Sequence, residues 1–121
     1  MDYLILPTSS APRQSMHLAL SPNGRALEAE AELRYLPAPD LWFLTIRDAG
    51  SGELLVNLIP LICSLEALND LLLPFSYLRG GKGLGSLFVL RAVDAPSTPD
   101  PSRDNLSEFR VVWGDTYPAP V

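Results

Sequence analysis

The chain has 121 residues, of which 47% are hydrophobic, 12 are proline and one is cysteine. This length and composition predict one folded domain over residues 1–121 and exclude a disordered chain. A formal net charge of −5 argues against nonspecific binding to nucleic acid or to an anionic membrane, because both need a basic face. The longest apolar stretch, residues 54–63, is too short to span a bilayer, and a single cysteine excludes an intramolecular disulfide.

The beginning of the chain is typical of short strands joined by turns. Residues 3–6 are an apolar run that ends at Pro7, and a loop rich in serine, alanine and proline follows. Residues 15–20 alternate apolar and polar side chains, which indicates a strand. The sequence Ser-Pro-Asn-Gly at residues 21–24 predicts a turn that joins this strand to residues 25–35 as a hairpin.

Residues 27–35 carry the clearest pattern in the chain. Apolar side chains alternate strictly with Glu28, Glu30, Glu32 and Arg34. Propensity favours a helix, because Ala, Glu, Leu and Arg are good helix formers. A helix would nevertheless scatter the apolar side chains around its axis and place Glu28 and Glu32 where they repel each other. We therefore predict a strand with one dry face and one acidic face.

The next segments extend this pattern into a β-meander. Residues 41–48 follow a Pro-Ala-Pro-Asp turn, and alternation places Trp42 and Phe43 on opposite faces of a strand. Trp42 or Phe43 anchors the core, and we expect Trp42 to be the inner one. Residues 53–60 are predicted to form the following strand after a glycine-containing turn.

The second half of the chain is less regular. A short helix is predicted for residues 64–73, because Ser64 is a suitable N-cap and leucines recur at helical spacing before Pro74. Residues 75–79 are ambiguous. A glycine-rich loop, an apolar strand, a proline-rich loop and a last strand with Trp113 in the core follow in this order. Their ranges are residues 80–85, 86–93, 94–104 and 108–113.

The glycine-rich loop does not match a nucleotide-binding motif. Lys82 is followed by Gly83, whereas a P-loop requires a serine or threonine at that position. The segment also precedes a predicted strand, whereas the dinucleotide-binding motif follows one. A mobile loop or a contact between subunits is the favoured interpretation.

No arrangement of residues predicts catalysis or a metal site. His17 is the only histidine and is expected at the surface or at an interface, and Cys63 is expected to be buried and inert. Two glutamates of residues 28–32 would lie close enough to act as the paired carboxylates of a glycosidase. No neighbouring residue, however, predicts the raised pKa that one of them would need to act as the acid. The aspartates of the proline-rich loop lack EF-hand spacing. We expect no enzymatic activity and no cofactor.

Three segments occur in an order that resembles a known family. They are Pro-Arg-Gln-Ser at residues 12–15, Trp-Phe-Leu-Thr-Ile-Arg-Asp at residues 42–48 and Arg-Asp-Asn-Leu at residues 103–106. Together with the order of the predicted strands, they resemble the baseplate plug family of tailed phages, first named from a cyanophage contractile tail. The resemblance covers most of the chain, and residues 71–82 form a longer insert than is typical of the family.

The resemblance implies a structural protein of the virion, made in the host cytoplasm and located near the distal end of the tail tube. The implied fold is a small, tail-tube-like antiparallel β-barrel or sandwich with one short helix. The implied partners are copies of the same chain, with a hexameric ring favoured and a trimer possible, and other tube, hub and baseplate proteins. No membrane and no specific nucleic-acid partner is expected.

Loops and termini with little apolar periodicity are expected to be ordered by contacts with other chains. The candidate assembly residues are Arg79, Gly80, Gly81, Lys82, Gly83 and Arg103. In a ring that continues the tail tube, Glu28, Glu30 and Glu32 are the candidate row facing the lumen, where they would repel passing DNA. The alternative for this row is a solvated outer face. The alternative for the whole chain is a small intracellular β-barrel that binds a peptide or small ligand.

Overall fold

The computed structural model describes residues 3–64, 68–78 and 83–116. Its strands are β1 (Tyr3–Ile5), β2 (Arg13–Leu20), β3 (Leu27–Leu36), β4 (Leu41–Asp48), β5 (Leu54–Pro60), β6 (Ser86–Arg91) and β7 (Phe109–Gly114). Three short 3-10 turns, η1 (Pro22–Gly24), η2 (Leu73–Phe75) and η3 (Leu106–Glu108), lie between strands. Each strand lies within a few residues of its predicted range.

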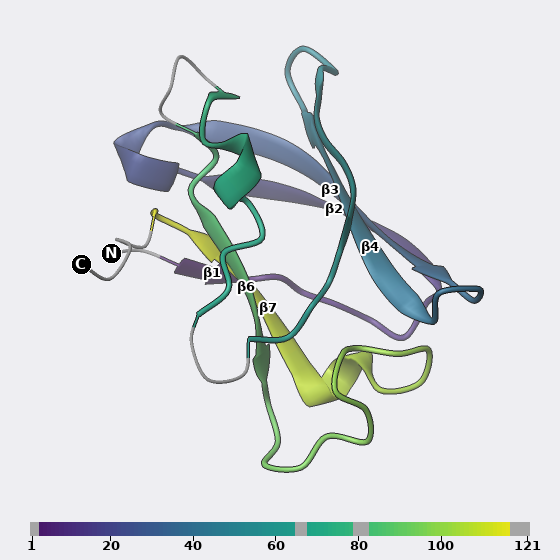
Figure 1. The fold of residues 1–121 in the computed structure, drawn as a ribbon. Helices are drawn as coiled ribbons and strands as arrows, with labels where there is room; N and C mark the ends of the chain where they lie inside the picture. Colours follow the sequence, from purple (N-terminus) through teal and green to yellow (C-terminus); the bar gives the residue numbers. More distant parts are fainter. Residues whose placement is uncertain (1–2, 65–67, 79–82, 117–121) are drawn as a thin grey trace.

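The strands form two open antiparallel sheets that pack face to face (Figure 1). The first sheet has the order β1-β7-β6, and the second has the order β2-β3-β4-β5. The predicted mainly β class is therefore confirmed, and of the two predicted architectures it is the sandwich, because the sheets do not close into a barrel. The hairpin predicted around residues 21–24 joins β2 to β3.

The strand predicted for residues 27–35 is confirmed in β3. Leu27, Ala29, Ala31 and Leu33 are buried, while Glu28 and Glu30 are exposed. Helix propensities differ by only about 0.7 kcal/mol per ordinary residue, whereas burying an aliphatic side chain contributes about 1.5–3 kcal/mol. Burial of one face therefore outweighs the helical preference of these residues.

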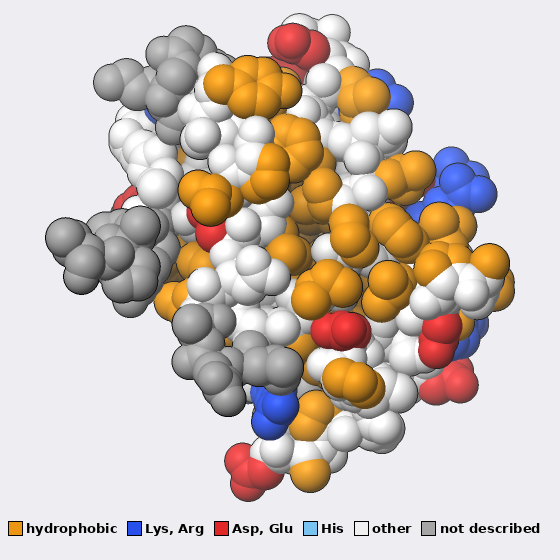
Figure 2. Space-filling model, viewed as in Figure 1, with side chains coloured by type: hydrophobic (Ala, Val, Ile, Leu, Met, Phe, Trp, Pro, Cys, Tyr) orange, Lys and Arg blue, Asp and Glu red, His pale blue; other side chains and the backbone are white. Residues whose placement is uncertain are grey.

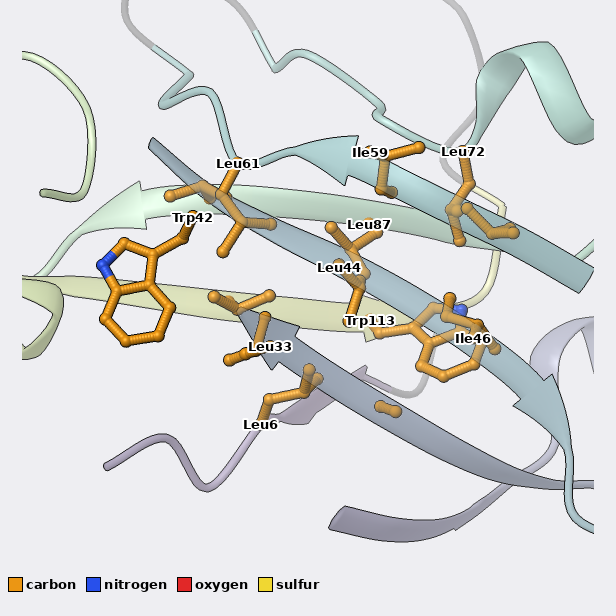
Figure 3. Packing of buried hydrophobic residues seen from close by; sticks show 14 of the residues in the cluster. Leu6, Leu33, Trp42, Leu44, Ile46, Ile59, Leu61, Leu72, Leu87 and Trp113 are labelled. Carbon is orange, nitrogen blue, oxygen red and sulfur yellow. The ribbon is translucent and has the colours of Figure 1, made fainter. Parts of the chain in front are cut away.

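Both predicted tryptophan anchors are confirmed. Trp42 and Trp113 are fully buried, and Figure 3 shows them at opposite ends of a row of aliphatic side chains from both sheets. Each indole N–H has a partner: Nε1 of Trp42 donates to the carbonyl of Ser102 at 2.7 Å, and Nε1 of Trp113 donates to the carbonyl of Leu84 at 2.7 Å. Buried indoles thus fix two loops against the core as well as filling it.

The helix predicted for residues 64–73 is wrong in its described part. Residues 68–70 have no regular structure, residues 71–72 form a turn, and residues 65–67 lie outside the described chain. The backbone of this segment is held by β6 instead, since Leu71 N donates to the carbonyl of Leu87 at 2.9 Å. Its leucines do not share one face, because Leu72 is buried whereas Leu68 is exposed.

Candidate assembly surfaces

The acidic row lies on the outer face of the β2-β3-β4-β5 sheet, as the alternation predicts. Glu28 and Glu30 are exposed, and Glu32 is half-buried. The row is paired with side chains of the neighbouring strand β2. Nδ1 of His17 lies 2.9 Å from Oε1 of Glu30, and its Nε2 lies 3.7 Å from Oε2 of Glu28. Nη2 of Arg13 lies 3.6 Å from Oε2 of Glu32.

The His17 imidazole is the one titratable group that this face perturbs clearly. The hydrogen bond to Glu30 raises the pKa of His17 above its usual 6.5, and the charges of Glu30 and Glu28 act in the same direction. The side chain is half exposed, so water and salt screen these interactions. His17 is therefore a surface histidine, as expected, and the carboxylates beside it favour its protonated form.

Two further arginines lie on the same face, Arg34 within the predicted alternation and Arg47 on the next strand. Arg47 on β4 lies opposite Glu30 in the register, and Arg34 projects from β3 on the side of the glutamates. Neither has a hydrogen-bond or ion-pair partner within the described chain. With Arg13 included, three arginines face three glutamates, so the formal charges of the outer face cancel. A single chain therefore does not present a face that repels phosphate.

A hollow of about 310 Å³ lies over this face. Its lining includes Arg13 and Ser15 on β2, Glu32 on β3, Thr45 on β4 and Leu58 on β5. Leu58 has a left-handed backbone with φ of 54°, and its N–H donates to Oγ1 of Thr45 at 3.3 Å. This irregularity of β5 forms one wall of the hollow. Among the described residues, this lining offers charges of both signs and no nucleophile paired with a base.

Exposed large hydrophobic side chains are most frequent in one part of the described chain. Among the described residues, five of the exposed large hydrophobic side chains lie between residues 54 and 77, and we call them the 54–77 surface. They are Leu54, Leu58, Leu68, Leu73 and Tyr77. Leu73 and Tyr77 keep 64% and 70% of their surface exposed. Figure 2 shows hydrophobic side chains gathered in a band across the face of the molecule in view.

A second, smaller apolar hollow lies on the outer face of the β1-β7-β6 sheet. It measures about 170 Å³ and is lined by Tyr3, Leu68, Phe88, Leu90 and Val112. The rings of Tyr3 and Phe88 lie 6.3 Å apart at their centres. Since Leu68 belongs to both features, the hollow adjoins the 54–77 surface.

The predicted assembly residues are only partly described. Arg79, Gly80, Gly81 and Lys82 lie outside the described chain. Gly83 is buried, and its N–H donates to the carbonyl of Leu78 at 2.9 Å. Arg103 is half-buried, and its Nη1 donates to the carbonyl of Ser10 at 3.1 Å. In the single chain, Gly83 and Arg103 thus hold its own loops together.

The proline-rich loop has internal order of its own. Oδ1 of the buried Asn105 accepts from the N–H of Ser102 at 2.6 Å, and its Nδ2 donates to Oγ1 of Thr98 at 2.7 Å. The carboxylate of Glu108 accepts from the backbone N–H and the hydroxyl of Ser97, both at 2.8 Å, and these bonds lower the pKa of Glu108. Described residues 94–104 therefore do not need another chain to order them. The Arg-Asp-Asn-Leu segment at residues 103–106 takes part in this order through the hydrogen bonds of Asn105.

Other kinds of site have little support in the described residues. No group of three His, Cys, Asp or Glu side chains among them can hold a metal ion. Cys63 is buried, and burial raises the pKa of its thiol, which disfavours the reactive thiolate. Within residues 3–64, 68–78 and 83–116, we find no helix with the length and apolar character needed to cross a membrane.

Comparison with known proteins leaves these surfaces as the basis for any functional argument. No protein-family model matches the sequence, and no curated protein is significantly similar to it.

Proposed function

We propose that the protein is a non-enzymatic structural component of a phage tail baseplate. It would lie near the distal end of the tail tube, as a plug, hub or tube-end ring. There it would bind copies of itself and other tube, hub and baseplate proteins. DNA would move past it when it leaves through the tail. The observation that carries the assembly role is the 54–77 surface. Figure 2 shows hydrophobic side chains gathered on one face of the molecule, and an exposed apolar patch is typical of a contact with another chain.

The sequence resemblance supports the baseplate setting. Its motif segments have structural roles in this chain: Trp42 fills the core, and Asn105 orders the proline-rich loop. A family recognised by such residues is one with a shared scaffold rather than a shared reaction. Assembly through an apolar side of the sandwich agrees with that kind of family.

The alternative of a ligand-binding barrel has less support. The sheets are open, and the apolar hollow at Tyr3 and Phe88 measures only about 170 Å³. Small-molecule sites usually enclose about 300–1,000 Å³. The larger hollow over β3 is lined mainly by charged and polar side chains.

The experiment replaces the two most exposed side chains of the surface by Leu73→Asp and Tyr77→Asp. We expect the double variant to fold as the wild type does, because neither side chain is buried. It should lose co-assembly with phage tail-tube and hub proteins, as measured by native mass spectrometry of the co-expressed proteins. Introducing charge into an apolar contact removes its hydrophobic contribution and leaves an unpaired carboxylate.

The matched control is Ser107→Asp, which adds a carboxylate at an exposed position of η3 outside the 54–77 surface. This variant should assemble as the wild type does. Normal assembly of the Leu73 and Tyr77 double variant would contradict the proposed role of the 54–77 surface.

A further inference from the structure

The four strands at the sheet edges differ in how well their free edges are protected. The free edge of β6 is covered, because Cys63 forms a parallel bridge with Val89 and Ser64 N donates to the carbonyl of Val89 at 2.8 Å. β5 is broken by register shifts and by the left-handed Leu58, devices that discourage pairing. β1 has only three residues.

β2 lacks all of these protections. Its eight residues pair with β3 in an unbroken register, and within the strand there is no proline, bulge or positive φ. Long, regular edges of this kind are templates for the addition of another strand. Among the described edges, β2 is therefore the one best suited to pair with another chain.

The free hydrogen-bonding groups of β2 can be assigned. Tyr35 N donates to the carbonyl of Pro12 at 2.8 Å, at the start of the β2–β3 ladder. In an antiparallel ladder, alternate residues bond to the same neighbour, so even-numbered residues of β2 bond to β3. The N–H and C=O groups of Arg13, Ser15, His17 and Ala19 therefore point away from the sheet. None of these groups has a hydrogen-bond partner within the described chain.

We propose that β2 pairs antiparallel with β2 of a second copy, around a two-fold axis at Met16. A second copy is the occupant that fits, because no other described edge offers a regular strand of the same length. Odd-numbered residues must face odd-numbered residues for the free groups to bond. In the register centred on Met16, Arg13 lies opposite Ala19 of the second copy, and Ser15 lies opposite its His17.

This register is also the one that the charges favour. The register centred on His17 would set two imidazoles directly opposite each other, although the neighbouring glutamates favour the charged form of both. Like charges directly opposite on paired strands are destabilising. The register centred on Met16 avoids this and forms about eight backbone hydrogen bonds between the copies, two for each bonded pair. It also brings together the half-buried Met16 side chains.

The two-fold pair is a different contact from the one proposed for assembly. It relates copies that point in opposite directions, whereas copies around a tail axis point the same way. The pairing therefore concerns the free protein. If the chain enters a ring whose copies all point the same way, β2 must leave the second copy. The two-fold pair uses the free edge of β2, which lies at the opposite end of the sheet from β5. It does not depend on the baseplate assignment.

The first test is the mass of the purified protein by sedimentation and native mass spectrometry. We expect a dimer for the wild type and a monomer for Ser15→Pro, because proline removes an outward N–H but no bond to β3. The Leu73→Asp variant is the matched control for the 54–77 surface and should remain dimeric. A monomeric wild type, or a Ser15→Pro variant that is folded and dimeric, would overturn the proposal.

Cross-linking tests the register without depending on proline. In a Cys63→Ala background, Met16→Cys places the two thiols across a non-hydrogen-bonded pair, where Cα atoms lie about 4.5 Å apart and a disulfide can form. We expect mild oxidation to give a covalent dimer with Met16→Cys and not with the exposed control Ser107→Cys. A dimer formed by His17→Cys but not by Met16→Cys would overturn the Met16-centred register.

Discussion

Single residues on the outer face of β3 show how a row of like charges is tolerated. Glu28 and Glu30 share the His17 imidazole, and Glu32 lies beside Arg13. The counter-charges come from the adjacent strand β2, which alternates in the same phase. The row is therefore part of a mixed-charge face rather than an isolated acidic surface.

The first prediction at this scale concerns His17. Its pKa is raised in the folded chain, so the imidazolium stabilises the fold fully below pH 6.5, and this contribution is lost as the pH rises through the folded pKa. The hydrogen bond that the imidazole donates to Glu30 is the largest cause. Glu30→Gln should therefore lower the pKa of His17 more than Glu28→Gln does, as measured by NMR titration of the imidazole.

The matched control for the His17 titration is Glu53→Gln, which removes a carboxylate outside the outer-face row and should leave the His17 pKa unchanged. If Glu28→Gln lowers that pKa as much as Glu30→Gln does, the assignment of the main interaction to Glu30 is wrong.

At the scale of elements, alternation was enough to predict the strands. A period of two over residues 27–35 and 41–48 determined β3 and β4, their inner faces and the burial of Trp42. The same alternation places Arg34 and Arg47 on the face of the sheet that carries the glutamates. Their effect on the charge of the face required the register between strands, which the sequence pattern does not state.

The segment after β5 could not be predicted in this way. Its leucine spacing suggested a helix, but contacts with β6 decide its conformation. Oδ1 of Asp70 accepts from Leu72 N at 3.0 Å and from Leu87 N at 3.1 Å, and Oδ2 accepts from the hydroxyl of Ser86 at 2.8 Å. Two of these donors are distant in the sequence, so no local pattern reveals them.

The prediction at this scale is that Asp70→Ala loosens the segment from β6. Leaving the donors of Leu87 and Ser86 without their acceptor should reduce the free energy of unfolding by about 1–3 kcal/mol. The amide of Leu71, which donates to the carbonyl of Leu87, should then exchange its hydrogen faster. Urea denaturation and hydrogen exchange provide the two measurements.

The control for Asp70→Ala is Asp94→Ala, at an exposed aspartate of the proline-rich loop. That change should leave both the unfolding free energy and the exchange of the Leu71 amide unaltered. Unchanged exchange in Asp70→Ala would show that Asp70 does not hold the segment to β6.

For the whole molecule, the distribution of charge matters more than its sum. The net charge of −5 argues against general DNA binding, yet the formal charges of the outer face of β3 cancel. If this face lined a lumen, the glutamates would mainly neutralise three arginines, and little repulsion of phosphate would remain. The row is then required to prevent the arginines from binding DNA.

The last prediction tests that role. Glu30→Gln with Glu32→Gln changes the net charge from −5 to −3 and leaves Glu28 alone of the three glutamates on the face that carries Arg13, Arg34 and Arg47. We expect this double variant to bind duplex DNA at low salt, as measured by fluorescence anisotropy, and the wild type not to bind. Binding should weaken steeply with added salt, because it depends on the release of counterions. The control, Asp94→Asn with Asp104→Asn, makes the same change in net charge at exposed positions of the proline-rich loop. Equal binding by both double variants would show that net charge alone keeps DNA away, whereas binding by the first alone would assign that role to the glutamates of β3.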